Sequence, residues 1–400
     1  MRAGRHRGEL PRRRAREGLS TGRVLLAGAA ALALGVGIGR FAYTPVLPAM
    51  QAATGFGAAT AGWIAGWNYL GYLLGALAAS LVAGRGTRVE ILVGSIVASI
   101  VTTAAMGLTT SIALWCALRF VAGLASAGVL VLSSAIVLET LSRESRPHLM
   151  GAHFSGVGIG IALSGIIVAV GAGMTDWSGL WFTLAGVSAA LALLTLPLPL
   201  ARRRSQPEAV ASRAAAPAER FPGSLLIASY FLEGLGYVIT GTFLVAIAKQ
   251  MPALGGAAEL LWIAVGLAGA PSSLLWIRAA QRWGAPAALI AAHLVQAAGI
   301  VLPVFFGSLW VALLAAVCFG GTLMGITAVA VSFGGRISAQ PARMIGLLTA
   351  AFGLGQMIGP VIAGWLAERQ GGFDGSLVLA AGAVVLGALL LAAGRATSRA

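Results

Sequence analysis

Residues 24–48 read VLLAGAAALALGVGIGRFAYTPVLP, an apolar stretch with one charged side chain, that of Arg40. A helix rises about 1.5 Å per residue, so roughly 20 residues cross the hydrocarbon core of a bilayer, which is about 30 Å thick. Lipid offers no hydrogen-bond partners to an unpaired backbone, and a closed β-barrel would show short alternating segments instead. The stretch therefore predicts a transmembrane helix.

Comparable apolar stretches recur along the whole chain. With the first, they are residues 24–48, 59–83, 91–111, 113–140, 150–173, 179–200, 223–248, 258–280, 285–307, 309–334, 343–368 and 374–394. Hydrophobic residues make up 58% of the chain and charged residues 10%, against about 25% charged in a typical soluble domain. The sequence predicts an all-α integral membrane protein with twelve transmembrane helices.

The basic residues fall in every second connection between these stretches. All but four of the 27 Lys and Arg residues lie in the two tails or in five alternate connections, the exceptions being Arg40, Arg119, Lys249 and Arg369. This positive-inside pattern predicts that both termini are cytoplasmic. The net charge of +15 is spread over short juxtamembrane clusters, which suit anionic lipid headgroups and not nucleic acid.

The chain divides into two similar halves. We expect a basic cytoplasmic tail at 1–23, a six-helix bundle at 24–200, a cytoplasmic linker at 201–222, a second six-helix bundle at 223–394 and a tail at 395–400. At an offset of about 195, motifs of the first half recur in the second: Leu114-Trp115 aligns with Leu309-Trp310, and Gly151, Gly158 and Gly160 align with Gly346, Gly353 and Gly355. Two repeated halves predict a transporter whose site lies between them at the midplane.

Several motifs resemble those of the major facilitator superfamily. The run Arg119-Phe-Val-Ala-Gly-Leu-Ala-Ser-Ala127 resembles its motif B, with Ala122 in place of the usual Gln. The loop Gly84-Arg85-Gly86-Thr87-Arg88 is a shortened motif A without its acidic residue. The runs Gly37–Pro48, Asn68–Ala76 and Gly234–Phe243 resemble the YbfB/YjiJ-type branch. The resemblance implies the major facilitator fold, with spans one, two, four, five and their repeats around the cavity, and a monomer.

Two arginines, Arg40 and Arg119, are expected at similar depth in the first and fourth spans. A charged residue inside a span is costly, so each should face a partner or a wet cavity, and no acidic residue lies at that depth in the first six spans. Arginine's planar fork suits a carboxylate or phosphate. We expect Arg40 and Arg119 to bind an anionic solute, aided by Tyr43, Asn68, Tyr72 and, from the eleventh span, Gln356.

Glu233, near the midplane of the seventh span, is the expected proton-coupling residue, because a buried carboxyl group favours its protonated form. Each of these three charged residues also has an alternative role. Arg40 could snorkel outward or bond backbone carbonyls near Pro45, Arg119 could fix the fourth span, and Glu233 could pair with one of the arginines.

The sequence favours a proton-coupled secondary carrier of a small organic anion that works by alternating access. The alternative is a proton-coupled drug or metabolite efflux antiporter, which motif B favours; a sensor or scaffold built on a carrier fold is more remote. An enzyme is not expected, because Lys249 is the only lysine and no GK[ST] nucleotide loop or HExxH motif exists. We expect no cofactor and no metal. The scarcity of lysine beside abundant arginine indicates a bacterial protein of the inner membrane.

Overall fold

The computed structural model describes residues 20–82, 87–199 and 220–398, and these residues form long helices throughout. The helices are α1 (Thr21–Leu32), α2 (Tyr43–Thr54), α3 (Ala58–Val82), α4 (Arg88–Ala105), α5 (Ile112–Arg143), α6 (Met150–Gly171), α7 (Trp177–Leu194), α9 (Gly223–Gln250), α10 (Ala258–Trp283), α11 (Ala285–Phe305), α12 (Leu309–Ile337), α13 (Pro341–Gln370) and α14 (Asp374–Thr397).

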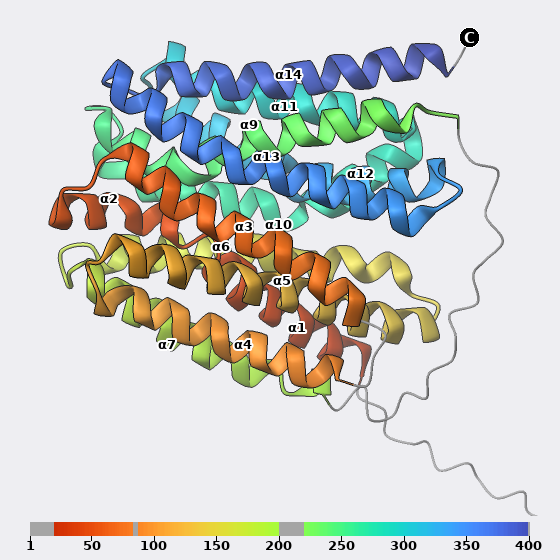
Figure 1. Cartoon of the computed structure of the whole chain (residues 1–400), viewed down its shortest axis with the longest axis horizontal. Coiled ribbons are helices and arrows are strands. Elements are labelled where there is room, and N and C mark those ends of the chain that lie inside the picture. Colours follow the sequence, from red (N-terminus) through yellow and green to blue (C-terminus); the bar gives the residue numbers. More distant parts are fainter. Residues whose placement is uncertain (1–19, 83–86, 200–219, 399–400) are drawn as a thin grey trace, which may run out of the picture.

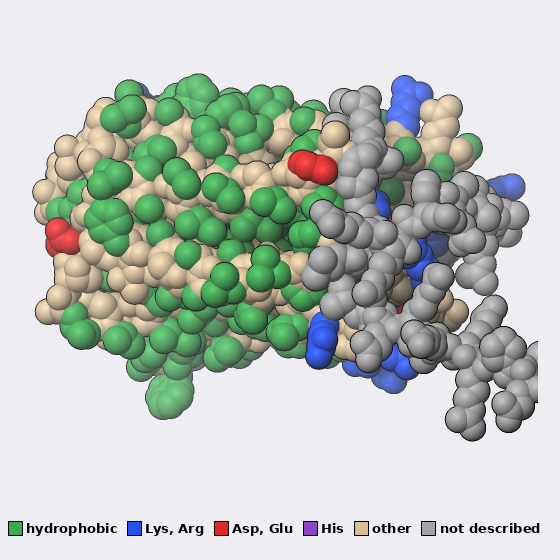
Figure 2. Space-filling view, turned by 90° about the horizontal axis from the view of Figure 1, so that it is seen from below, with side chains coloured by type: hydrophobic (Ala, Val, Ile, Leu, Met, Phe, Trp, Pro, Cys, Tyr) green, Lys and Arg blue, Asp and Glu red, His purple; other side chains and the backbone are tan. Residues whose placement is uncertain are grey.

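Eleven helical segments in the described residues are long and apolar enough to cross a membrane, the first running from Thr21 through α2 to Thr54. The 25-residue helix α3 lies between the first and second of them along the chain and matches the predicted span 59–83. Figure 2 shows the expected surface, in which apolar side chains cover the length of the helices and Lys and Arg gather at one end. The twelve-helix prediction is confirmed.

The first span differs from the single helix that its apolar run predicts. After α1 the chain makes a π-helical turn, Ala33–Ile38, and then an irregular turn, Gly39–Ala42, whose first and last residues keep helical dihedral angles, before α2 begins. Pro45 lacks the N–H that would bond the carbonyl of Phe41, and that carbonyl accepts instead from Thr44 N at 3.2 Å. Arg40 therefore lies in a broken segment of the span.

The helices form two bundles, α1–α7 and α9–α14, drawn one below the other in Figure 1. Their packing repeats: α3 packs on α5 as α10 packs on α12, α4 on α5 as α11 on α12, and α4 on α7 as α11 on α14. This is the two-bundle fold that the internal repeat predicted. The predicted linker falls mostly on residues outside the described ranges, as does most of the N-terminal tail; α1 begins at Thr21, and α14 continues to Thr397.

The two bundles meet along α3–α13 and α6–α10, which are also related by the repeat. On α6, a Cβ at Gly158 would collide with the backbone of Ala270, and one at Gly266 of α10 would collide with the backbone of Ala162. The small residues of both helices thus allow the backbones to touch across the interface.

We call the end that holds the start of α1 and the end of α14 the terminal end, on the right in Figure 1, and the opposite end the distal end. Three hydrogen bonds cross between the two bundles. They lie at the level of Arg40 and Arg119 or closer to the distal end. Thr44 Oγ1 donates to Gly241 O at 2.5 Å, Ala59 N donates to Glu368 Oε1 at 2.8 Å, and Trp262 Nε1 donates to Ser164 Oγ at 3.1 Å. The bundles are therefore joined at the distal end.

Candidate functional site

Arg119 of α5 is buried against the break in the first span. Its Nη1 donates to Gly39 O at 3.0 Å and its Nη2 donates to Arg40 O at 2.5 Å. These carbonyls lie where the helix is interrupted, so the guanidinium replaces backbone partners that the break removes. The aromatic ring of Tyr43 lies 5.2 Å from the Arg119 guanidinium carbon. Arg119 thus binds the first span itself, and only its Nε lacks a partner.

Arg40 lies in the broken segment with only 5% of its surface exposed, and its surroundings differ from those of Arg119. Its guanidinium carbon is 3.9 Å from the ring centroid of Tyr72 and 4.8 Å from that of Tyr69, both on α3. Its Nε and Nη2 have no hydrogen-bond partner, and within the described ranges it forms no ion pair. The face of the guanidinium is covered by tyrosines while one edge keeps its donors free.

Asn68 of α3 joins the fourth span, at Arg119, to the second span. Its Nδ2 donates to Arg119 O at 2.8 Å, and its Oδ1 is buried without a partner. The hydroxyl of Tyr43 donates to Ala61 O at 3.2 Å, so this side chain ties α2 to α3. The predicted residues Arg40, Tyr43, Asn68, Tyr72 and Arg119 therefore form one cluster in the first bundle.

The second bundle faces this cluster with aromatic side chains. Phe352 of α13 stacks on Tyr230 and Tyr237 of α9, with ring centroids 4.4 and 5.4 Å apart and planes within 14° and 5°. Gln356, the predicted site residue of this bundle, donates through Nε2 to the hydroxyl of Tyr237, and its Oε1 has no partner. Tyr237 lies close enough to Arg40 to interact with its charge.

Sequence reasoning did not assign roles to Tyr69, Tyr230, Tyr237 and Phe352. A signal existed, because the chain has only 5 tyrosines in 400 residues and all of them lie in the first, second and seventh spans. The structure brings four of them to the two arginines and places the fifth, Tyr230, close to Tyr72. Helical periodicity alone could not show that the seventh span faces the second.

Glu233 of α9 points into the second bundle and does not pair with an arginine. Its Oε2 lies 3.8 Å from Nε2 of His293 on α11, and both side chains are at most 2% exposed. His293 Nδ1 donates to Leu289 O at 2.8 Å, so in the neutral ring Nε2 is the acceptor that faces Ser229 Oγ and Glu233. Gln296 is also within interaction distance of the carboxyl group. The alternative of a Glu233–arginine lock is therefore wrong for this structure.

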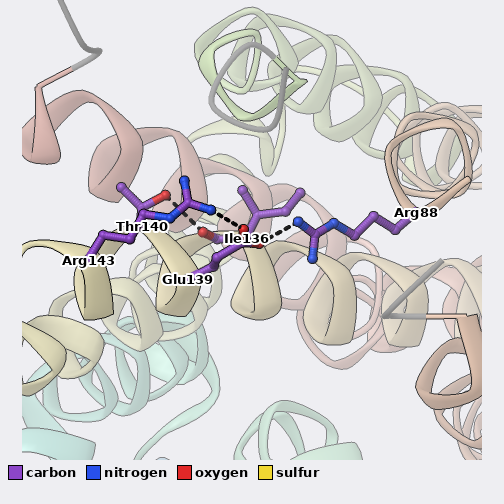
Figure 3. A network of polar contacts seen from close by, with 5 residues as sticks. All are labelled: Arg88, Ile136, Glu139, Thr140 and Arg143. Carbon is purple, nitrogen blue, oxygen red and sulfur yellow. Dashed lines mark hydrogen bonds and ion pairs between the residues drawn. The ribbon is translucent and has the colours of Figure 1, made fainter. Parts of the chain in front are cut away.

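A second charged network lies at the terminal end (Figure 3). Glu139 of α5 forms ion pairs with Arg88 at the start of α4 and with Arg143, whose Nη2 is 2.5 Å from its Oε1. The shortened loop between the second and third spans, residues 84–88, has no acidic residue of its own. The fourth span supplies the carboxylate, that of Glu139, which pairs with Arg88. The Arg88–Glu139 ion pair joins α4 to α5 within one bundle, while the Arg143–Glu139 pair lies within α5.

In the described part of the chain, no group of three or more His, Cys, Asp or Glu side chains is placed to hold a metal ion. A small apolar pocket inside the second bundle lies between Leu244 and Met251 of α9, Gly299 and Pro303 of α11, and Leu377. It lacks charged lining residues and is separate from the arginine cluster.

Comparison with known proteins now identifies the family. A model of the family described as "Uncharacterised MFS-type transporter YbfB" matches residues 32–392. The chain belongs to this family. The YbfB-type chain is also 26% identical over 286 residues to the uncharacterized MFS-type transporter YceJ of Bacillus subtilis (strain 168), which covers 69% of this chain and 71% of that protein.

Solved structures share the fold of this YbfB-type transporter. The crystal structure of nucleoside transporter NupG has a TM-score of 0.69 at 15% identity, covering 94% of this chain and 99% of that chain. A bacterial homolog to the human lysosomal transporter Spinster, in an inward-facing and unoccupied conformation, has a TM-score of 0.64 at 18% identity, covering 94% and 96%. The protein is a multi-pass MFS transporter and not an enzyme.

Proposed function

We propose that the protein is a proton-coupled secondary carrier of a small organic anion, which binds at Arg40 between the two bundles. The observation that carries the proposal is the free edge of the Arg40 guanidinium. A buried guanidinium without a carboxylate partner is unfavourable unless another group satisfies it. A transported anion supplies that group and is held by a charge that the protein leaves unpaired.

Residues contributed by both bundles support the proposal of alternating access. Arg40, Tyr69 and Tyr72 come from the first bundle, while Tyr237 and Gln356 come from the second. If the bundles rock about α3–α13 and α6–α10, a solute between them is exposed to one side at a time. In this structure the distal hydrogen bonds hold that side together, so the terminal side is the one that would open.

Arg119 contributes to the same site in a different way. Its hydrogen bonds to the carbonyl groups of Gly39 and Arg40 hold the broken segment that carries Arg40. We propose that Arg119 positions Arg40 and adds positive charge, and that Asn68 and Tyr43 support this arrangement.

Glu233 and His293 are the proposed proton-coupling pair. Two buried titratable groups 3.8 Å apart can share or exchange one proton without placing a lone charge in an apolar bundle. Ser229 faces His293, and Gln296 and Tyr230 are the other polar groups close to the carboxyl group. The Glu233→Gln variant should bind substrate but lose the pH dependence of transport; unchanged pH dependence would remove Glu233 from the coupling mechanism.

The anion site can be tested by thermal unfolding of the detergent-purified protein with carboxylates, sugars, amino acids, nucleosides and lipophilic cations. A ligand at 100 times its dissociation constant stabilises the native state by about 2.7 kcal/mol. Stabilisation by carboxylates that disappears in Arg40→Gln is the expected result. Stabilisation by neutral solutes only, equal in the variant, would contradict an anionic substrate.

A proton-coupled efflux antiporter is the second candidate. Motif B at Arg119–Ala127 and the stacked rings of Tyr230, Phe352 and Tyr237 favour it, because planar lipophilic molecules bind aromatic faces. Lipophilic cations that stabilise the wild type and Arg40→Gln equally would favour efflux over anion transport.

The positive terminal end supports an orientation with both termini in the cytoplasm. We propose that the protein is a monomer in a bacterial inner membrane, with its arginine clusters against anionic lipid headgroups. Labelling of a cysteine introduced after α14 from one side of the membrane only would test this orientation.

A further inference from the structure

We propose that the transported anion is an aromatic monocarboxylate, a planar ring that carries one carboxylate group. This inference rests on the anion carrier proposed above and names its substrate class. Three features of the site lead to it: the free edge of Arg40, the tyrosine hydroxyl opposite it, and two aromatic faces that remain reachable.

The free donors of Arg40 match one carboxylate. Nε and Nη2 are the two nitrogen atoms on the same edge of a guanidinium group, and both are without partners in Arg40. Two parallel N–H groups on one edge bind the two oxygen atoms of a carboxylate side by side. Tyr72 lies over the guanidinium at 3.9 Å from its ring centroid, so the carboxylate has to approach in the plane of the fork.

The charge of the site favours a single carboxylate. Arg119 uses both of its terminal nitrogen atoms on Gly39 O and Arg40 O, so it does not offer a second fork. Across the interface, the Tyr237 hydroxyl accepts from Gln356 Nε2, which leaves its own O–H to donate. A carboxylate on Arg40 that also accepted from Tyr237 would join the two bundles through one bound group.

The aromatic preference comes from the side chains beside the fork. Tyr69, Tyr230 and Tyr237 are buried, whereas Tyr72 and Phe352 are half-buried and still present accessible surface. Tyr72 is close enough to Tyr230 to interact with it, and Phe352 stacks on Tyr230 at 4.4 Å. A ring attached to the carboxylate would therefore lie against Tyr72 and Phe352, from opposite bundles.

The site also contains two buried hydrogen-bond acceptors without partners. Oε1 of Gln356 and Oδ1 of Asn68 are buried without donors. A hydroxyl or amino substituent on the ring would satisfy one of them, and a buried acceptor left unsatisfied lowers the affinity for a molecule that lacks the group. Substituted aromatic acids should therefore bind more tightly than the unsubstituted acid.

The experiment compares three probes of similar size by isothermal titration calorimetry on the intact protein in detergent at pH 7. Benzoate has both the charge and the ring, cyclohexanecarboxylate has the charge only, and benzamide has the ring only. An aromatic contact predicts that benzoate binds between about twofold and about tenfold more tightly than cyclohexanecarboxylate. Benzamide should bind at least about tenfold more weakly than benzoate.

Two variants test the assigned residues. Arg40→Lys keeps the charge without the planar fork and should weaken both carboxylates. Phe352→Leu removes one of the two aromatic faces and should reduce the preference for benzoate over cyclohexanecarboxylate; an unchanged preference would remove Phe352 from the site. The comparison of probes on the wild type stands even if a variant fails to fold.

The outcomes separate this inference from the anion carrier itself. Equal affinity for the two carboxylates, or tighter binding of cyclohexanecarboxylate, would overturn the aromatic class and leave an anion carrier in place. A response to aliphatic dicarboxylates or phosphate with none to benzoate would do the same. Benzamide binding as tightly as benzoate would overturn both.

Discussion

The two buried arginines should respond differently to the same substitution. Arg119 and Arg40 are 2% and 5% exposed, lie at one level of the first bundle and face tyrosine rings. They differ in their hydrogen bonds, because Arg119 donates to two main-chain carbonyls of the broken span and Arg40 keeps Nε and Nη2 free. Replacement of each by methionine separates a structural arginine from a binding one.

The expected magnitudes follow from these contacts. Arg119→Met leaves the carbonyls of Gly39 and Arg40 buried without donors, at about 1–3 kcal/mol each, so the free energy of unfolding should fall by about 2–6 kcal/mol. Arg40→Met loses cation–π contacts of about 0.5–2 kcal/mol and relieves an unpaired buried charge, so its change should stay within about 1 kcal/mol of zero.

The assay is reversible unfolding by SDS in mixed micelles, followed by helical circular dichroism. Arg119→Lys serves as an intermediate, because an ammonium group keeps the charge but does not form the planar fork. Binding of carboxylates should be lost in Arg40→Met. The reasoning is refuted if Arg40→Met destabilises the protein as much as Arg119→Met, since the free edge of Arg40 would then be a structural element.

Three further substitutions test other contacts. Glu139→Gln removes two partly exposed ion pairs at the terminal end and should lower the unfolding free energy by less than about 2 kcal/mol. The loss should be smaller at high salt, which screens exposed charges. A loss above about 2 kcal/mol would contradict the small contribution expected of exposed ion pairs. Gly158→Ala at the α6–α10 contact should cost about 1–3 kcal/mol in the same SDS assay, whereas the control Gly186→Ala, which has open space around it, should cost nothing. Glu368→Ala removes the acceptor of the Ala59 N–H and should raise the thiol reactivity of a cysteine introduced at Ala59. Glu368→Gln keeps an acceptor and should raise that reactivity less. Equal reactivity with Glu368 and with both replacements would show that the hydrogen bond between Ala59 and Glu368 does not hold the distal end.

The helices and their order could be predicted from sequence because the signal is local. Each span is an apolar run of the length that lipid requires, and the predicted ranges differ from the observed helices by a few residues at most ends. The break in the first span was not predicted in detail. Its π-helical turn and the bonds from Arg119 depend on a helix some 80 positions away along the chain.

The site could be predicted only in part, for a related reason. Depth along a helix follows from counting residues, so the sequence identified Arg40, Arg119 and Glu233 as buried charges within the membrane. The direction in which each side chain points depends on how the helix is rotated against its neighbours. Uniformly apolar helices carry almost no polar face from which to infer that rotation.

The sequence by itself thus determined the number, length, order and twofold repeat of the helices, because bilayer thickness and hydropathy act on contiguous residues. Tertiary structure alone decided which buried charges have partners. Arg119 bonds the broken first span, Glu233 faces His293 inside the second bundle, and Arg40 keeps one edge free between the bundles. The reason is physical: a hydrogen bond requires two groups within about 3 Å, and that proximity is set by helix packing across segments far apart in the chain.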